Sequence, residues 1–522
     1  MIAVSPTVSR RRFLWGSAAL ASGLAVGGAL TACAPGGDTA TVGGDTPVRG
    51  GRLRMGVLDG NQKGNLDPHI AIGFGSIVRG FALYAKPWEW GPTMQPQLAL
   101  AEFAEPNADA SVWTIRLRQG LEFHHGKTVT ADDLIHTIRR IQDPKTGSAV
   151  RDPFVDADAL RKVDDRTVEV RFVGGRGYLP FPAVFVNFGG VIPTDFDPVT
   201  NPVGAGPYKL VDYTPGQRSL FTRFNNYFRP GTPYPDELEI IDFKDDAGRV
   251  AALQAGQIDT ADRISSEQLR VLEGDKRVSI VANQTGNAAS INLNLAKEPF
   301  NNPKVVEAVR LILDRDELVA RALGGRGRVA NDVFSPNDPT FPTGIAQRKQ
   351  DITRAKALLA EAGAQNLSFE LTVGPVANAS ATAAIVAEQA RKAGVKVTIN
   401  QVDSATFNGP QRDQWVASIP TSAPENPFAS RARYYTPNAP VNPTHFDNPR
   451  FTELYEQVVR QPDTEKRKPL VAEMEQIFHD KGGEIIWGYI DSVDAVASRV
   501  GGVVEEKSMF PTWRFDKLWL RQ

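Results

Sequence analysis

Residues 368–402, SFELTVGPVANASATAAIVAEQARKAGVKVTINQV, carry the clearest secondary-structure pattern in this chain of 522 residues. Apolar and polar residues alternate over 368–373 and again over 395–402, which predicts two half-buried strands. The residues between them, 379–393, predict a helix that ends at Gly394. A strand, a helix and a strand in this order predict a βαβ unit, in which both strands place one face against the crossover helix.

Outside this unit the chain continues to alternate short strand-like runs with amphipathic helices, and it has no repeat period or heptad pattern. Strands are expected at 52–58, 113–118, 167–172, 208–213, 219–224 and 238–243. Helices are expected at 130–140, 302–313, 351–363, 448–460 and 463–481, several of them behind an Asn, Asp or Thr cap. The fold class is therefore mixed α/β.

A change of composition near 283–290 (NQTGNAAS) separates a strand-rich first half from the second half. The strand-like residues 484–498 can return the chain to the first half. Two crossings predict two lobes, and hinge closure between lobes can bury a ligand. We expect lobe 1 to comprise 51–285 plus 495–522, and lobe 2 to comprise 286–494.

Composition and charge exclude several classes of protein. The chain is 41% hydrophobic and 23% charged, values typical of a globular protein. Its 59 Lys and Arg residues balance 60 Asp and Glu residues, and no basic stripe is present, so we expect no nucleic-acid partner. With Cys33 as the single cysteine, neither an internal disulfide nor a cysteine-based metal site can form.

The N-terminus has the layout of an export signal. Residues 9–14, SRRRFL, resemble a twin-arginine signal, and an apolar stretch then leads to Leu-Thr-Ala-Cys at 30–33, which resembles a bacterial lipobox. We expect 1–32 to be a signal peptide, Cys33 to be lipidated, and 33–50 to form a flexible tether rich in Gly, Pro and Thr. A plain N-terminal membrane helix is the alternative.

Motifs of catalysis are weak or missing. The glycines at 120 and 126 are separated by five residues where a P-loop needs four, so a turn is the better interpretation. The sequence has no Gly-x-Ser-x-Gly and no His-Glu-x-x-His. His124 and His125 are adjacent and would point to opposite faces of a strand, and the other histidines are scattered, so no metal site and no cofactor are expected. The acidic pairs 132–133 and 245–246 are expected to cap helices.

An ordered set of blocks resembles the family 5 extracellular solute-binding proteins, the receptors for oligopeptides, dipeptides and nickel complexes. The blocks are NLDPH (65–69), WTIRLRQGLEFH (113–124) with GK (126–127) and TADD (130–133), GAGPY (204–208), ALQAGQID (252–259) and FDNPRF (446–451). The resemblance implies a two-lobed periplasmic-binding-protein fold of type II, the Venus flytrap fold, with a subdomain inserted in lobe 1 near 95–190. It also implies a ligand site between the lobes and no enzymatic activity.

Aromatic residues are the best candidates for the pocket wall, because ligand pockets combine apolar walls with few fixed polar groups. The resemblance places five aromatic candidates near the cleft or hinge: Trp88, Trp90, Trp415, Trp487 and Tyr489. Phe74 is a further candidate for ligand binding. Core packing is the alternative for each of them. Arg433, and Arg431 beside it, could bind a ligand carboxylate, with a solvated loop as the alternative.

One segment departs from the family pattern. In peptide-binding relatives an acidic residue before an Asp-Pro or Glu-Pro stretch holds the α-ammonium of the ligand, whereas here Thr421 or Ser422 occupies that place in PTSAPENPF (420–428). A hydroxyl group adds no charge, which puts ordinary peptide binding in doubt. Glu425 can substitute if the loop is shifted.

The resulting hypothesis is a lipid-anchored receptor at the outer face of the cell membrane or in the periplasm. It would act as a monomer, capture peptides or peptide-like solutes and deliver them to an ABC permease and ATPase complex. The alternatives are a secreted hydrolase acting on cell-wall peptide or glycan, and a sensory lipoprotein with the same fold. Sequence alone leaves the solute open among peptides, modified peptides, sugars and metal chelates.

Overall fold

The structure is a computed structural model that describes residues 46–59, 64–70, 73–148, 151, 155–177, 189–374, 378–407, 409, 411–420, 428–437, 439 and 442–521. All of these residues belong to one compact unit, Ala40–Gln522. The expected signal peptide, Cys33 and most of the expected tether lie outside the described residues.

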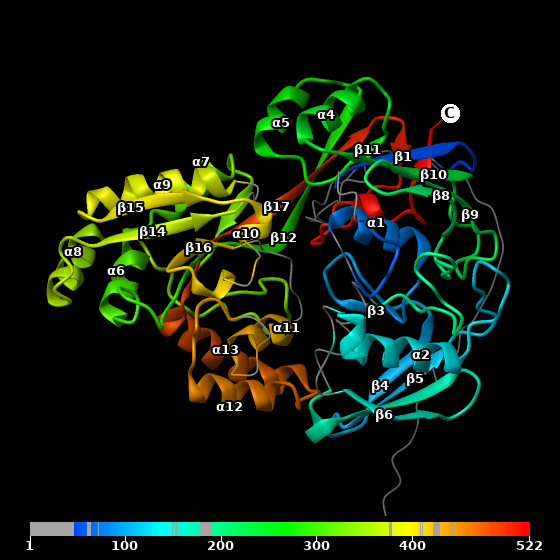
Figure 1. The fold of residues 1–522 in the computed structure, drawn as a ribbon, viewed down its shortest axis with the longest axis horizontal. Helices are drawn as coiled ribbons and strands as arrows, with labels where there is room; N and C mark the ends of the chain where they lie inside the picture. Colours follow the sequence, from blue (N-terminus) through cyan, green and yellow to red (C-terminus); the bar gives the residue numbers. More distant parts are fainter. Residues whose placement is uncertain are drawn as a thin grey trace, which may run out of the picture. The chain divides into compact units, whose positions relative to one another are not determined.

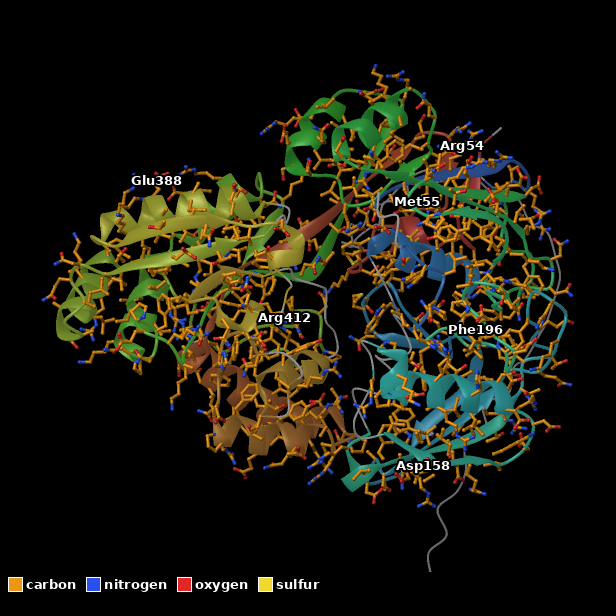
Figure 2. All side chains as sticks on the ribbon, in the orientation of Figure 1. Arg54, Met55, Asp158, Phe196, Glu388 and Arg412 are labelled. Carbon is orange, nitrogen blue, oxygen red and sulfur yellow. The ribbon has the colours of Figure 1, made fainter. Side chains whose placement is uncertain are left out.

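Eleven strands of the described residues form one mixed sheet (Figure 1). Its order is β15-β14-β16-β12-β17-β11-β1-β10-β9-β8, and β13 pairs with β17. The strands are β1 (Arg52–Leu58), β8 (Tyr208–Thr214), β9 (Arg218–Arg223), β10 (Glu237–Phe243), β11 (Thr260–Ala261), β12 (Val278–Leu293), β13 (Gly327–Val329), β14 (Ser368–Val373), β15 (Lys396–Gln401), β16 (Ala417–Ile419) and β17 (Glu484–Ala497). The predicted strands of the first half are confirmed within one residue at each end. Met55 of β1 is fully buried, whereas the neighbouring Arg54 is partly exposed and pairs with Glu239, as expected for alternating sides of a strand (Figure 2).

The long strands β12 and β17 connect the two halves of this sheet. They pair antiparallel over most of their length, and the register shifts between Asn283 and Asn287. Buried apolar residues form clusters on either side of this shift. The buried members of two clusters lie at or before Val281 and from Val493 onward, whereas the buried members of the other two clusters all lie between Ala288 and Tyr489.

The predicted βαβ unit is confirmed. Strands β14 and β15 pair in parallel, and α9 (Ala379–Lys392) connects them. On β14 the side chains of 369, 371 and 373 are buried, but Ile399 near the end of β15 is 40% exposed. Because β15 is the last strand of the sheet and has a neighbouring strand on one side only, the predicted burial of one face holds for β14 and only partly for β15.

A separate four-stranded sheet occupies the range expected for the inserted subdomain. Its order is β4-β5-β7-β6, with α2 packed against β6 and β7. The elements are β4 (Ala101–Pro106), β5 (Val112–Leu117), α2 (Ala131–Gln142), β6 (Val155–Lys162) and β7 (Thr167–Phe172). Asp133 accepts hydrogen bonds from the backbone N–H (2.9 Å) and the hydroxyl (2.8 Å) of Thr130, so the predicted cap of α2 is confirmed.

The other helices begin behind the capping residues that the sequence indicated. Asn302, Asp351 and Asn448 each accept a hydrogen bond from a backbone N–H of the first helical turn. The remaining helices and short strands are α1 (Phe74–Leu83), β2 (Trp88–Trp90), β3 (Pro96–Leu98), α4 (Asp246–Gln254), α5 (Ser266–Leu272), α6 (Pro303–Ile312), α7 (Arg315–Ala322), α8 (Ile352–Glu361), α10 (Ser404–Phe407), α11 (Phe428–Ala432), α12 (Pro449–Val458), α13 (Thr464–Lys481), β18 (Val500–Gly501) and β19 (Trp519–Leu520).

The glycines of the GAGPY block allow a close approach between backbones. A Cβ at Gly204 would clash with the carbonyl oxygen of Leu83, and one at Gly206 would lie 2.5 Å from that of Ala82. Only residues without a side chain fit against this end of α1. The block therefore fixes the position of α1 on lobe 1.

Candidate ligand-binding site

The candidate site begins at the register shift of β12 and β17. The pairing of Asn283 with Ser492 is followed directly by that of Asn287 with Ile490, so β12 carries extra residues here. The hydroxyl of Thr285 in this bulge donates to the carbonyl oxygen of Ile490 at 2.8 Å, which holds the two strands together. A bulge in the paired strands that join the two halves of the sheet is a suitable hinge, because it interrupts the hydrogen-bond ladder without ending it.

Several buried polar atoms lie at this register shift of β12 and β17. The side-chain atoms Asn283 Nδ2, Asn287 Oδ1 and Ser492 Oγ are buried and have no hydrogen-bond partner among the described residues. Asp491 Oδ1 also lacks a hydrogen bond, but it forms an ion pair with Arg328 at 3.6 Å. Polar atoms buried in this way normally bind protein, water or ligand, because desolvation without a partner is unfavourable. Because these atoms lie on both β12 and β17, they indicate a binding place for a polar ligand.

The loop after β11 packs directly beside these atoms. The backbone N–H of Arg263 donates to Asp494 Oδ1 (2.9 Å), and that of Ile264 donates to the carbonyl oxygen of Val493 (2.6 Å). Asp262 accepts from both Arg249 (2.9 Å) and Arg263 Nε (2.7 Å), and Arg249 and Asp262 are fully buried. This ionic network fixes the loop against β17.

An aromatic wall completes this side of the site. The guanidinium carbon of Arg263 lies 3.6 Å from the ring centroid of Phe74 and 6.0 Å from that of Trp513. Phe74 is the first residue of α1 and follows Gly73, whose φ of +80° is in the region that favours glycine. Trp513 is 1% exposed, and its Nε1 has no hydrogen-bond partner among the described residues.

The acidic groups of the site have shifted pKa values. Burial raises the pKa of Asp494 to about 7, with the nearby Asp262 as a second cause. For Asp262, burial acts in the same direction, but Arg263 and Arg249 outweigh it and the pKa is lowered. Burial also raises the pKa of Asp491. Shifted acids next to a hinge are typical of functional sites.

The structure places the predicted site residues in different surroundings. Phe74 lies in the site described above. Trp88 is 3% exposed and packs edge-on against Trp113 at 5.9 Å, while Trp487 is 1% exposed within the core of the second half, so core packing describes both. Tyr489 on β17 is buried, and its hydroxyl donates to the carbonyl oxygen of Val333 at 2.8 Å.

Two further predicted residues lie in the second half of the chain. Trp415 is half-buried, and its Nε1 lacks a hydrogen-bond partner among the described residues. The guanidinium of Arg433 lies 5.3 Å from the ring centroid of Tyr434. Its neighbour Arg431 pairs with the buried Glu484, so the solvated-loop alternative is wrong for Arg431. Thr421, Ser422 and Glu425 lie outside the described residues.

Sequence reasoning missed Arg263, Asp494 and Trp513. The composition change near 283–290 coincides with the register shift of β12. No local signal marks Arg263, because its partners come from α1, β17 and the C-terminal segment.

The histidines lie apart from this site. His124 is in a turn, not in the strand that sequence analysis assumed, since Gly120 and Gly126 adopt positive φ values. Burial lowers the pKa of both His69 and His124 to about 4. Across the part of the chain that the structure describes, no three His, Cys, Asp or Glu side chains are grouped as a metal site.

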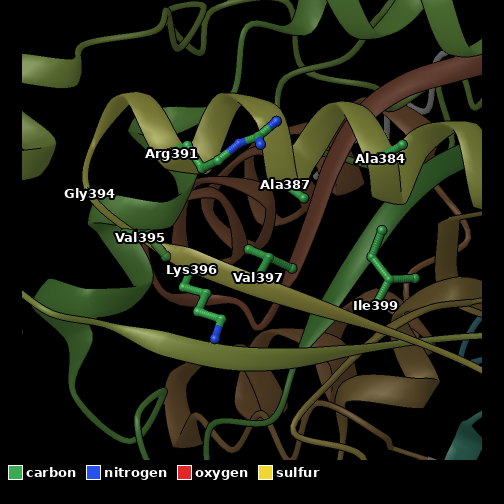
Figure 3. Close-up of a pocket in the computed structure, with 8 residues that line it drawn as sticks. All are labelled: Ala384, Ala387, Arg391, Gly394, Val395, Lys396, Val397 and Ile399. Carbon is green, nitrogen blue, oxygen red and sulfur yellow. The ribbon is translucent and has the colours of Figure 1, made fainter.

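A groove of about 390 Å³ lies between α9 and β15 at the far edge of the main sheet. It is lined mainly by alanine and by β-branched side chains (Figure 3). Its lining residues include Arg391 and Lys396 but no acid and no aromatic ring. None of the polar atoms of the hinge contributes to it.

The mixed sheet and the two long strands β12 and β17 that join its halves are typical of a two-lobed α/β binding protein. The profile of the bacterial extracellular solute-binding proteins, family 5 (middle), matches residues 93–439, and the chain belongs to this family. It is 26% identical over 353 residues to the glutathione-binding protein GsiB of Pectobacterium atrosepticum, covering 65% of this chain and 67% of that protein. It is 26% identical over 447 residues to heme-binding protein A of Haemophilus influenzae, covering 78% and 81%.

Solved structures share the whole fold. The substrate-binding protein CtaP of Listeria monocytogenes aligns with a TM-score of 0.79 and 25% identity, over 91% of this chain and 100% of that one. The oligopeptide-binding protein AppA of Bacillus subtilis, in complex with a nonapeptide, aligns with a TM-score of 0.75 and 20% identity over 91% and 100%. The predicted two-lobed fold with its inserted subdomain is thereby confirmed. Within the described residues no helix is both long and apolar enough to cross a membrane.

Proposed function

We propose that this protein is the extracellular receptor of an ABC importer, that it is not an enzyme, and that it captures peptides or peptide-like solutes by closing its two lobes. The observation that carries the proposal is the set of buried polar atoms on β12 and β17 that have no hydrogen-bond partner within the described part of the chain. Hinge closure is the known way in which such proteins enclose a solute. Relatives named for glutathione and heme, and a fold relative holding a nonapeptide, support an organic solute.

The proposed lobes are 51–285 plus 495–522 and 286–494, with the subdomain near 95–190. The division of the buried clusters between Val281 and Ala288 on β12, and between Tyr489 and Val493 on β17, supports these boundaries. Because β12 and β17 are the paired strands that run through both lobes, a small change at their bulge would rotate one lobe against the other.

The proposed anchor is a lipid on Cys33 after export through the twin-arginine route. Cys33→Ser removes the acceptor thiol, so we expect the protein to be released from the membrane or to remain as uncleaved precursor. Fractionation and labelling with a radioactive fatty acid measure this. Fatty-acid labelling that equals the wild type would refute the anchor.

Export provides a matched control for that experiment. Replacing Arg10, Arg11 and Arg12 with lysine leaves Cys33 in place but removes the arginine pair, so the precursor should remain in the cytoplasm. Export that continues in a strain without the twin-arginine translocase would contradict the proposed route.

We further propose that Glu425 binds a cationic group of the solute, since it is the acidic residue of the 420–428 segment. A buried ammonium needs a charge or several hydrogen bonds in place of water. For such a solute, Glu425→Gln should weaken binding by about 1.5 to 3 kcal/mol, the scale of a hydrogen bond to a charged group.

The test is a thermal-shift titration of both proteins with trialanine, N-acetyl-trialanine and a neutral sugar, with recovery of each compound checked by mass spectrometry. Binding raises the melting temperature by mass action. Trialanine should stabilise the wild type more than its acetylated form and should be recovered intact. Equal shifts in wild type and Glu425→Gln would eliminate Glu425, and cleavage of trialanine would support a hydrolase instead.

A further inference from the structure

We propose that Arg263 is a ligand-contacting residue that determines specificity, and that the solute it recognises carries a carboxylate. The inference rests on the proposed function and names a chemical group of its solute. Arg263 lies in lobe 1, on the short loop between β11 and α5. It belongs neither to the predicted clamp segment nor to the predicted aromatic wall.

The backbone at Arg263 is unusual. Its φ is +47°, in the left-handed region that residues other than glycine and asparagine rarely adopt. Strained residues of this kind persist where the surrounding structure over-determines them, and they cluster at ligand sites. Here two hydrogen bonds to β17, from the N–H groups of Arg263 and Ile264, hold the loop in place.

This backbone directs the guanidinium group to a defined place. Its plane is limited on one side by the ring of Phe74 at 3.6 Å, and its Nε is bonded to Asp262 at 2.7 Å. The second oxygen of Asp262 is occupied by Arg249 at 2.9 Å. Asp262 is thus shared between two guanidinium groups, and Nη2 of Arg263 is left buried without a partner among the described residues.

Other buried donors lie on the segments that surround or precede the Arg263 loop. Within the described part of the chain, Trp513 Nε1, Ser492 Oγ and Thr260 Oγ1 are buried and have no hydrogen-bond partner. The ring centroid of Trp513 lies 6.0 Å from the guanidinium carbon of Arg263. Ser492 is two residues before Asp494, which accepts the hydrogen bond that holds the loop. Thr260 is three residues before Arg263 in the sequence. Buried donors are normally paired with an acceptor, and a ligand rich in acceptors would pair several of these donors at once. A carboxylate fits best, because arginine forms its strongest hydrogen bonds with planar anions.

The test uses the full chain purified in detergent and a casein hydrolysate of short peptides, together with the same hydrolysate after methyl esterification of its carboxyl groups. Retained peptides are quantified by mass spectrometry. The amount of peptide that the wild type retains from the esterified pool should be at least about tenfold lower than the amount from the untreated pool. This is the effect expected for the loss of a hydrogen bond to a charged group. This comparison requires no variant.

Three variants locate the effect. Arg263→Asn removes the cation but suits the left-handed backbone, so it should retain about tenfold to a hundredfold less untreated peptide than the wild type and should not distinguish the two pools. Arg263→Lys keeps the charge without the planar fork and should be intermediate. Arg277→Asn, at an exposed arginine of the same lobe paired with Asp275, should match the wild type.

The outcomes separate this inference from the proposed function. Equal retention of both pools by the wild type would leave peptide capture intact and overturn the role of Arg263. Retention by Arg263→Asn at the wild-type level would do the same. Retention of neither pool by the wild type would overturn peptide capture and this inference together.

Discussion

Replacing Arg315 with methionine is expected to lower the free energy of unfolding by about 3 to 5 kcal/mol, the scale of removing one member of a buried ionic network. Arg315 is 4% exposed and donates to the carbonyl oxygens of Ala330 and Ile486, both at 2.9 Å. It also donates to Asp332 at 2.7 Å, and Asp332 is fully buried. Methionine has a similar length but cannot donate to any of these three acceptors.

The pKa of Asp332 shows how much its surroundings depend on arginine. Burial acts to raise this pKa, but Arg315, Arg310 and Arg348 outweigh burial and lower it. Without Arg315, fewer positive charges offset the unfavourable burial of the Asp332 carboxylate. The strain of its own left-handed backbone, with φ of +57°, remains.

A matched control lies on the same helix. Arg321 of α7 is 46% exposed and pairs with Glu317 and with Glu388 on the outer side of α9 (Figure 2). Exposed pairs contribute little to stability, so Arg321→Met should leave the urea midpoint nearly unchanged. Urea unfolding followed by tryptophan fluorescence measures both variants. Similar midpoints for Arg315→Met and Arg321→Met would show that the buried network is not what stabilises this lobe.

The second large effect concerns Asp494→Asn, which should stabilise the protein at pH 8 by about 4 kcal/mol, since a shift of about three pK units corresponds to roughly that energy. Asp494 is fully buried, and its pKa is raised from 3.8 to about 7. Asparagine can keep both contacts, with Oδ1 accepting from the N–H of Arg263 and Nδ2 donating to the hydroxyl of Thr512.

The direction of the pH dependence follows from this shift. The folded protein holds the proton of Asp494 more tightly than the unfolded chain does, so this group favours folding most at low pH. Its contribution falls as the pH rises from about 4 to about 7, and it stays low above that range. Asparagine does not titrate. The gain from Asp494→Asn should therefore be large at pH 8 and small near pH 4.

Urea unfolding at pH 5 and at pH 8 checks this prediction. Asp212→Asn, at a surface position 51% exposed, serves as control and should show no such pH dependence. A gain for Asp494→Asn that is the same at both pH values would mean that titration of this carboxyl group is not its cause. Asp494 lowers the stability of the protein at pH 8, yet it contacts the loop of Arg263. This combination indicates a residue that serves the ligand site and not the stability of the fold.

Most of the regular structure could be predicted because its signals are local. Alternation placed β1, β10 and β14, and the Asn and Asp caps placed α6, α8 and α12. The continuity of β12 could not be predicted, since NQTGN favours a loop and only the pairing with β17 makes it a strand. The partial exposure of β15 also depends on tertiary position, because only the order of the sheet makes it an edge strand.

The candidate site was less accessible to prediction than the fold. Phe74 could be proposed from the resemblance to the family, but its ring contact is with Arg263, which lies 189 positions further along the chain. The bond between Arg263 and Asp494 joins residues 231 positions apart. Such contacts carry no periodicity or cap signal. Trp88 and Trp487 carry the same aromatic signal as Phe74, yet both are enclosed in cores, because residue type alone does not separate a pocket wall from a core.

Native mass spectrometry of the full chain, incubated with a small-molecule extract and released gently from micelles, tests the central claim most directly. A solute receptor should carry one solute per chain, and that solute should be recovered chemically unchanged after denaturation. We also expect the solute to contain a carboxylate. A chain that emerges without bound solute, or that converts the solute into products, would contradict the account.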